Sequence, residues 1–260
     1  MKNVSEHHIT PSAPRKVPPG LCALAVMTKA PRAGQVKTRL TPPLTPEEAA
    51  VLNTCFLRDT AAAISAAITT GGARGIAVST PAGAEEEFAE ILPSHFALVL
   101  QRGDALSERL INATEDLFKI GFQSLCLIDS DSPTVPLNAY AKAVAWLSTG
   151  EERIVLGPSH DGGYYLIGLN RMHRRIFEDI TWSTPHVFEQ TMQRAKKIGV
   201  AVELLPTWYD VDDRATLCRL CDELLGDKAN DVGGYPAPET RAFLENLVAR
   251  EKRGRFWPAE

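Results

Sequence analysis

Four polar stretches of this sequence carry residue types that bind phosphate groups and divalent cations. The first is basic, with Lys29, Gly34, Lys37 and Arg39 following directly after an apolar segment. The guanidinium of Arg matches phosphate oxygens as a fork, and the ammonium of Lys does so as a point charge. The spacing matches neither a Walker phosphate loop nor a G-x-G-x-x-G dinucleotide motif. This basic loop is therefore a candidate phosphate site, with a solvated turn as the alternative.

Two further stretches are acidic and also follow apolar segments. Asp129 and Asp131 stand two residues apart in DSDSP. This spacing can present both carboxylates to one metal ion, or one to a metal and one to a ribose hydroxyl. The alternative is a turn, which Asp, Ser and Pro all favour. In the second stretch, DVDD, Asp212 is a ligand candidate and Asp213 is predicted to cap the helix that follows.

The fourth stretch, SHDGGYY, joins two apolar segments. Gly162 and Gly163 permit backbone torsions and a close ligand approach that other residues forbid. Asp161 would then be held at a sharp bend, next to the glycines and Tyr164. A structural Asp-Gly hairpin is the alternative. His160 is given no catalytic role.

The elements that must position these stretches alternate between strands and helices. Apolar runs that suit strands buried on both faces are separated by amphipathic segments, which is typical of a parallel sheet covered by helices on both faces. Ligands of such sheets bind beyond the carboxyl ends of the strands, where the four polar stretches fall. Strands are predicted at 21–27, 75–80, 96–101, 124–128, 153–158, 164–169 and 201–206, and helices at 45–68, 84–92, 104–121, from 136, at 185–198 and at 213–225.

Composition and charge restrict the classes of function. The chain has 260 residues and a net charge of -4, which argues against general nucleic-acid binding because that needs a basic face. No run approaches the roughly 18 apolar residues of a membrane span. The five cysteines mostly lie in apolar segments, which favours reduced thiols in a cytoplasmic protein. Cys218 and Cys221 are assigned to core packing rather than to a metal site.

A single main domain is predicted over residues 20–225, because this range contains no linker and no internal repeat. Residues 1–19 are polar and contain proline, so a disordered leader is expected there. Residues 226–260 form a tail with a helix. This tail is expected to pack on the domain or on a partner subunit, which leaves a homodimer open.

Taken in order, the motifs resemble a family of mostly uncharacterised bacterial glycosyltransferase-like proteins. The stretches that carry the resemblance are MTKAPRAGQVKTRL, QRGDALSERL, IDSDSP, LGPSHDGGYYLIGL, WSTPHVFEQT and YDVDD, within residues 21–220. The family is similar to the guanylyltransferase of deazaflavin-cofactor biosynthesis and, more distantly, to the molybdenum-cofactor guanylyltransferase. The resemblance implies a single three-layer α/β/α domain with a mostly parallel mixed sheet, the GT-A fold of nucleotide-diphospho-sugar transferases.

The resemblance also implies a site for a nucleotide and for Mg or Mn. Asp131 would be the main metal ligand, and Asp129 is an additional candidate that departs from the family pattern Gly-x-Asp-x-Pro. Asp161, with Asp212 as a weaker candidate, would be a second acidic ligand or orient the acceptor. The remaining implied contacts are to the nucleotide phosphates by Lys29, Gly34, Lys37 and Arg39, to the nucleoside by Gln101, Gly103 and Asp104, and to the acceptor by Gly162, Gly163 and Tyr164.

The function implied is metal-dependent transfer of a sugar from a nucleotide sugar to a small-molecule acceptor, with Asp161 or Asp212 as candidates to take the acceptor's proton. Transfer of a nucleotidyl group with release of pyrophosphate is the main alternative. A haloacid-dehalogenase-type phosphatase is disfavoured, because Pro133 stands where its D-x-D-x-T motif needs Thr or Val. A non-catalytic nucleotide-binding protein is the last alternative.

Overall fold

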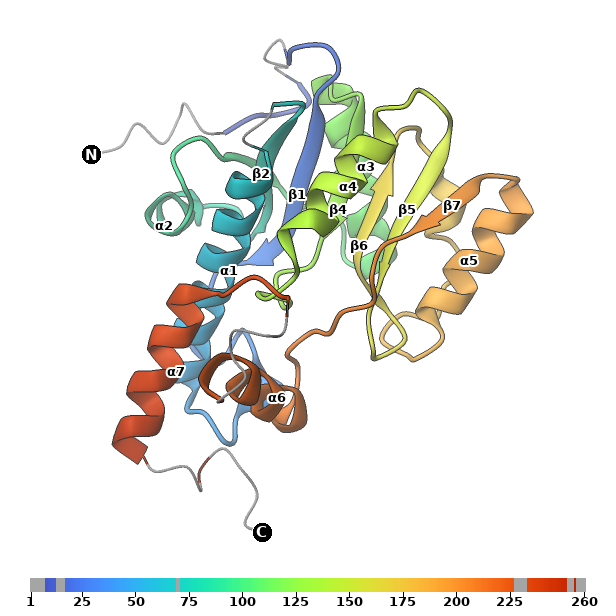
Figure 1. The fold of residues 1–260 in the computed structure, drawn as a ribbon. Helices are drawn as coiled ribbons and strands as arrows, with labels where there is room; N and C mark the ends of the chain where they lie inside the picture. Colours follow the sequence, from blue (N-terminus) through green and yellow to red (C-terminus); the bar gives the residue numbers. More distant parts are fainter. Residues whose placement is uncertain (1–7, 13–16, 69–70, 227–232, 252–254, 256–260) are drawn as a thin grey trace.

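The computed structural model describes residues 8–12, 17–68, 71–226, 233–251 and 255. Within them the chain forms seven strands, seven α-helices and two short 3-10 helices (Figure 1). The strands are β1 Cys22–Lys29, β2 Ala73–Thr80, β3 Ala97–Leu100, β4 Ser124–Ile128, β5 Arg153–Pro158, β6 Tyr164–Leu169 and β7 Ala201–Leu204. The helices are α1 Pro46–Ala67, α2 Glu85–Ile91, α3 Leu106–Ile120, α4 Leu137–Leu147, α5 Val187–Ile198, α6 Arg214–Leu225 and α7 Pro238–Glu251, with 3-10 helices η2 Thr38–Leu40 and η3 Arg174–Ile176.

All seven strands lie in one sheet, in the order β3-β2-β1-β4-β6-β5-β7. Every pair is parallel except those of β6, which runs antiparallel to both β4 and β5. The predicted α/β class with a mostly parallel mixed sheet is therefore confirmed. Because β6 reverses direction, the loop between β5 and β6 returns directly along the carboxyl edge of the sheet. No helix in the part of the chain that the structure describes is long and apolar enough to cross a membrane.

The two faces of the sheet carry separate apolar cores. Along β1, Leu24 and Val26 pack on one face with residues of α1 and α4, while Ala23 and Ala25 pack on the other with residues of α3. This alternation is the period-2 pattern of a strand that is buried on both sides. A third core lies between η2, the start of α1, α6 and α7. Figure 1 shows α6 and α7 beyond the end of β1, so this core closes the carboxyl edge on one side.

Local sequence signals set the start of α1. The hydroxyl of Thr45 accepts the N–H of Glu48 at 3.2 Å, and the Glu48 carboxylate accepts the N–H of Thr45 at 2.9 Å. Pro46 occupies the first turn, where its missing N–H leaves no helical bond unmade. The capping box predicted at this position is therefore confirmed.

Part of the leader differs from the disorder expected over residues 1–19. His8 forms a parallel bridge with Leu98, and the N–H of Ile9 donates to the Leu98 carbonyl at 3.0 Å. Ile9 is buried in the core on the α3 face. An apolar side chain next to an unpaired strand edge explains this docking, because the edge offers both hydrogen bonds and cover. Residues 1–7 and 13–16 of the predicted leader lie outside the described residues.

The C-terminal helix α7 packs on α1 and α6. A side chain of α1 caps it. The buried carboxylate of Asp59 accepts the N–H of Glu239 at 3.1 Å and the N–H of Thr240 at 2.8 Å. These donors lie in the first turn of α7, where backbone N–H groups lack helical partners. Asp59 therefore holds the tail helix in place.

Replacing Asp59 with alanine is expected to lower the free energy of unfolding by about 2 kcal/mol, because loss of a cap costs roughly 0.5–2 kcal/mol and two buried donors lose their acceptor. Asp59→Asn should cost less, since an amide oxygen still accepts one bond and burial already raises the pKa of this carboxyl. Urea denaturation measures both. The exposed Glu47→Ala in the same helix is the control, and an equal loss in Glu47→Ala and Asp59→Ala would contradict the capping role.

Candidate functional site

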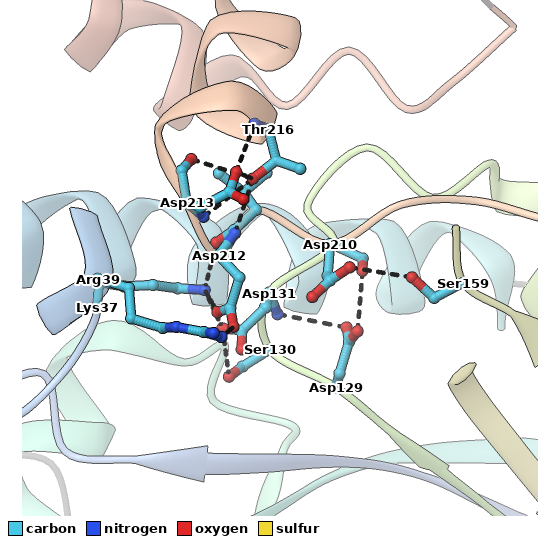
Figure 2. Close-up of polar contacts among 12 residues, drawn as sticks. Lys37, Arg39, Asp129, Ser130, Asp131, Ser159, Asp210, Asp212, Asp213 and Thr216 are labelled. Carbon is cyan, nitrogen blue, oxygen red and sulfur yellow. Dashed lines mark hydrogen bonds and ion pairs between the residues drawn. The ribbon is translucent and has the colours of Figure 1, made fainter. Parts of the chain in front are cut away.

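The basic loop after β1 meets both acidic stretches at the carboxyl edge of the sheet. The Nζ of Lys37 lies 2.7 Å from Asp131 Oδ1, and Arg39 Nη1 lies 2.9 Å from Asp212 Oδ2. The two acidic stretches are also joined through backbone, because the N–H of Val211 donates to the Asp131 carbonyl at 2.9 Å. Figure 2 shows both basic side chains extended towards these aspartates. The convergence expected from a parallel sheet is therefore observed for these three stretches.

The two cations of this cluster differ in exposure. The side chain of Lys37 is 3% exposed, whereas that of Arg39 is 76% exposed. The Lys37 ammonium also donates to the Val211 carbonyl at 2.7 Å and lies 3.6 Å from Asp212 Oδ1. Arg39 thus reaches solvent while keeping its carboxylate partner, and Lys37 forms a bridge inside the protein.

Asp129 takes no part in these ion pairs, and the hydrogen bonds to its side chain come from its own loop. Its carboxylate accepts the Ser132 hydroxyl at 2.9 Å and the N–H of Asp131 at 3.3 Å, and no cation of the described residues pairs with it. Burial raises the pKa of Asp129 well above its usual range, and the negative charges of Asp131 and Asp210 raise it further. The fold therefore holds this carboxylate in an environment that disfavours its charge.

Asp210 is a functional candidate that the sequence placed only within an acidic stretch, in which Asp212 was the predicted ligand. Its carboxylate accepts the Ser159 hydroxyl at 3.0 Å (Figure 2). Burial raises its pKa, with a further contribution from the negative charge of Asp161. Asp212, by contrast, is paired with Arg39. Sequence spacing could not separate the two, because both belong to the same short stretch after β7.

The loop between β5 and β6 is a sharp bend fixed by glycine. Gly162 has a φ of +89°, and a Cβ there would lie 2.2 Å from the Pro185 carbonyl oxygen. The Gly162 carbonyl accepts the N–H of Phe188 at 2.8 Å, which docks the loop on the start of α5. The side chain of Asp161 folds back and accepts the N–H of Gly163 at 2.8 Å. The predicted bend is confirmed, and it leaves Asp161 exposed at the site.

A large cleft of about 740 Å³ runs along this edge of the sheet. One part of its wall is acidic and the other is apolar, so it can contact both a charged or hydroxylated group and a hydrophobic one. The acidic wall comprises Asp129, Asp161, Asp210, Asp212 and Asp213, and the apolar wall includes Met27, Leu106, Leu110, Leu127, Ile167, Trp182 and Val187, with Tyr164 beside them. Trp182 and Tyr164 meet edge to face, with ring centroids 6.4 Å apart.

A smaller cavity of about 240 Å³ adjoins the basic loop. Its walls include Lys29, Gln35, Lys37, Thr38, Arg39, Asn53, Ser130 and Asp131. Arg39 and Asp212 line both this cavity and the large cleft. Asp129 lines the large cleft and Asp131 lines the smaller cavity, and the two spaces share Arg39 and Asp212 as a common wall.

Five residues predicted at the site do not line either cavity: Gly34, Gln101, Gly103, Asp104 and Gly162. Gly103 has a φ of +110° and its carbonyl accepts the Arg109 side chain at 3.1 Å. The N–H of Asp104 donates to Glu108 at 2.9 Å. These bonds organise the start of α3, whose Leu106 and Leu110 do line the large cleft. Roles for Gly34, Gln101, Gly103 and Asp104 in binding a nucleotide stay predictions, as does a role for Gly162 at the acceptor.

The acidic residues of the site can hold a divalent cation only together with other ligands. Within the described ranges, no three His, Cys, Asp or Glu side chains are grouped so as to hold a metal by themselves. Mg²⁺ is usually bound by one or two carboxylates together with substrate phosphates and water. Asp129 and Asp131 can supply such a pair, because Asp129 has no cation partner within the described chain and its charge is disfavoured without one. The donor set fits a metal that is shared with phosphate oxygens.

Comparisons with known proteins concern the family and the fold. Residues 63–184 match a family described as an uncharacterised protein conserved in bacteria, DUF2064. The solved structure of a proposed nucleotide-diphospho-sugar transferase from Desulfovibrio desulfuricans G20 is similar to this chain with 27% identity and a TM-score of 0.75, covering 88% of this chain and 96% of that one. No curated protein matches.

A more distant likeness concerns the fold alone. CMP:2-keto-3-deoxy-manno-octonic acid synthetase, solved in complex with CTP, has 10% identity and a TM-score of 0.50, over 76% of this chain and 96% of that one. The motifs, the sheet order and these likenesses agree. The chain thus resembles an uncharacterised bacterial family with the nucleotide-diphospho-sugar transferase fold, as its motifs predicted.

Proposed function

We propose that this protein is a metal-dependent transferase that binds a nucleotide sugar and transfers the sugar to a small acceptor. The observation that carries the proposal is the pair of adjoining spaces, one basic and one acidic and apolar, which share Arg39 and Asp212 as a common wall. A transfer reaction needs two such spaces, one for the group that leaves and one for the group that receives.

The smaller cavity suits the diphosphate of the donor. Its cations, Lys29 and Arg39, are exposed, and the backbone turn around Gly34 lies between them in the chain. Arg39 can keep its bond to Asp212 and still offer its other N–H groups to phosphate, since a guanidinium carries five donors. Cations aimed at a leaving diphosphate stabilise the charge that develops there.

Asp129 and Asp131 are proposed to hold Mg or Mn at the boundary of the two spaces. When bound, the metal would supply charge neutralisation for the departing phosphate oxygens. The protein's own part is to keep two carboxylates close in a partly buried place, through the bonds that Ser132 and the Asp131 backbone make to Asp129. This role for the metal also accounts for the disfavoured charge of Asp129.

The large cleft is proposed to receive the acceptor. Its volume of about 740 Å³ falls within the range of about 300–1,000 Å³ that is usual for small-molecule sites. Asp161 and Asp210 face it as candidate general bases, and the raised pKa of Asp210 suits a group that must take a proton near neutral pH. The apolar wall suits an acceptor with a hydrophobic part.

Nucleotidyl transfer is the second candidate. It is supported by the fold shared with a synthetase that was solved with CTP, because the same two spaces could hold a nucleoside triphosphate and a sugar. The phosphatase alternative is weakened by the position of Asp129. This residue follows β4, the fourth strand along the chain, whereas the phosphatase motif would follow the first strand.

The proposal is tested by a thermal-shift screen against nucleotide sugars and nucleoside triphosphates, each with and without Mn²⁺, because a ligand of the native state raises the melting temperature with its concentration. Ligands that stabilise are then incubated with an acceptor panel while nucleoside diphosphate and pyrophosphate are measured separately. Release of nucleoside diphosphate supports sugar transfer, and release of pyrophosphate supports the second candidate. Stabilisation without turnover over every acceptor would favour a non-catalytic binding protein, and absence of any shift would refute the nucleotide site.

A further inference from the structure

The ammonium of Lys37 makes two short polar contacts inside the protein and lies near a third oxygen. It contacts Asp131 Oδ1 at 2.7 Å and the Val211 carbonyl at 2.7 Å, and Asp212 Oδ1 lies 3.6 Å away. An ammonium has three donors, and three oxygens surround this one. The ammonium also lies 5.4 Å from the centre of the Phe56 ring, which covers it from α1. The basic loop is thereby tied to both acidic stretches through one side chain.

Lys29 provides a contrast within the same cavity. Its side chain is exposed, and its Nζ donates to the Gln35 carbonyl at 3.2 Å. Both lysines line the smaller cavity, yet only Lys37 neutralises a carboxylate. A phosphate could contact Lys29 without breaking an ion pair, whereas it must compete with Asp131 for Lys37.

The ion pair has a consequence for Asp131 as well. The ammonium that lies 2.7 Å from Asp131 Oδ1 repels a metal ion that approaches the same carboxylate, so the two cations compete for it. Displacement is favourable only when the ammonium finds another anion, because a buried charge left without a partner is costly. The phosphate of a ligand in the smaller cavity would be such an anion.

We propose that Lys37 occupies the metal's place on Asp131 in the unliganded protein and releases it only when a phosphate enters the smaller cavity. The inference rests on the proposed function, since it takes the ligand to be a nucleotide with a diphosphate or triphosphate. Lys37 is then a positioning residue that prevents tight binding of free metal and couples metal entry to nucleotide entry. By reciprocity, each ligand raises the affinity of the other.

The test measures binding of Mn²⁺ alone, without nucleotide, by electron paramagnetic resonance. Lys37→Met removes the charge and retains a stem that can pack on Phe56. This variant is expected to bind Mn²⁺ at least about tenfold more tightly than the wild type, because a neighbouring opposite charge alters the affinity of a carboxylate for its proton by roughly 10- to 1,000-fold. Lys37→Arg keeps the ion pair and should show wild-type affinity.

Lys29→Met is the matched control, since it removes the same charge from the same cavity without freeing a carboxylate; its Mn²⁺ affinity should stay close to that of the wild type. In the double variant Lys37→Met/Asp131→Asn the gain in Mn²⁺ affinity should disappear. This result would identify the Asp131 carboxylate as the metal ligand that the loss of Lys37 makes available. Circular dichroism and melting temperatures verify that each variant is folded.

Unchanged or weaker Mn²⁺ binding in folded Lys37→Met would overturn the inference, as would an equal gain in Lys29→Met. Neither outcome touches the proposed function, which stands or fails on nucleotide binding by the wild type. A third outcome separates the two proposals: Lys37→Met binds Mn²⁺ more tightly, but the wild type binds no nucleotide. The competition between Lys37 and the metal would then stand. The nucleotide as the releasing ligand and the proposed function would both be refuted.

Discussion

Replacing Asp129 with asparagine is expected to raise the melting temperature of the protein and to abolish most of its metal-dependent activity. Asparagine has the same shape, and its amide can still accept the N–H of Asp131 and bond to Ser132, so the loop keeps its hydrogen bonds. What the substitution removes is a negative charge that burial and two neighbouring aspartates disfavour.

The pH dependence has a definite sign. Because the pKa of Asp129 is raised in the folded state, the native protein binds more protons than the unfolded chain at pH values above the ordinary aspartate pKa of about 3.9. Stability therefore falls as pH rises from that value through the folded pKa. At pH 7 the variant should therefore have the higher free energy of unfolding and the higher melting temperature. The difference should vanish near pH 4.

Activity should change in the opposite direction. Loss of residues that support a metal typically lowers affinity or activity by roughly 10- to 100-fold, and a direct ligand should cost at least that. Calorimetry from pH 4 to 8 and a turnover assay in Mn²⁺ measure the two effects. Asp161→Asn is the control for stability, since it replaces an exposed carboxylate and preserves the bond to Gly163. A lower melting temperature in Asp129→Asn would show that the Asp129 charge stabilises the fold.

Replacing Gly162 with alanine is expected to damage both the fold and the cleft. The φ of +89° strains any residue with a Cβ, and that Cβ would lie 2.2 Å from the Pro185 carbonyl oxygen. The Pro185 carbonyl oxygen is a backbone atom, so it cannot relieve the clash by a rotamer change as a flexible side chain could. Left-handed strain costs about 1–3 kcal/mol and overpacking costs a similar amount, so we expect a loss of about 3 kcal/mol.

The damage should reach the acceptor space, because Trp182, Pro185 and Val187 all line the large cleft. We therefore expect a higher KM for the acceptor with little change in the affinity for the nucleotide. The matched control is Gly199→Ala, where φ is +72° but no atom lies within 4 Å of the added Cβ. That variant should lose only the strain, about 1 kcal/mol. Equal losses in the two variants, measured by urea denaturation, would rule out the clash with Pro185.

Much of the secondary structure could be predicted because its causes are local. The capping box of α1 lies within four consecutive residues, Thr45 to Glu48, and the alternation along β1 depends only on neighbouring positions. The family resemblance implied a mixed sheet, but it did not identify β6 as the antiparallel strand. The docking of Ile9 on β3 was not expected, because composition alone cannot show that a strand edge far along the chain stays open for it.

The sequence by itself determined the chemical types at the site and the edge of the sheet where they gather: a basic loop after β1 and acidic stretches after β4 and β7. Only the tertiary structure decided how these groups are paired. The fold pairs Lys37 with Asp131 and Arg39 with Asp212, and it places Asp129 and Asp210 in the wall of the large cleft. Spacing along the chain could not reveal this, because ion pairs and buried charges depend on distances between segments that only the packed sheet brings together.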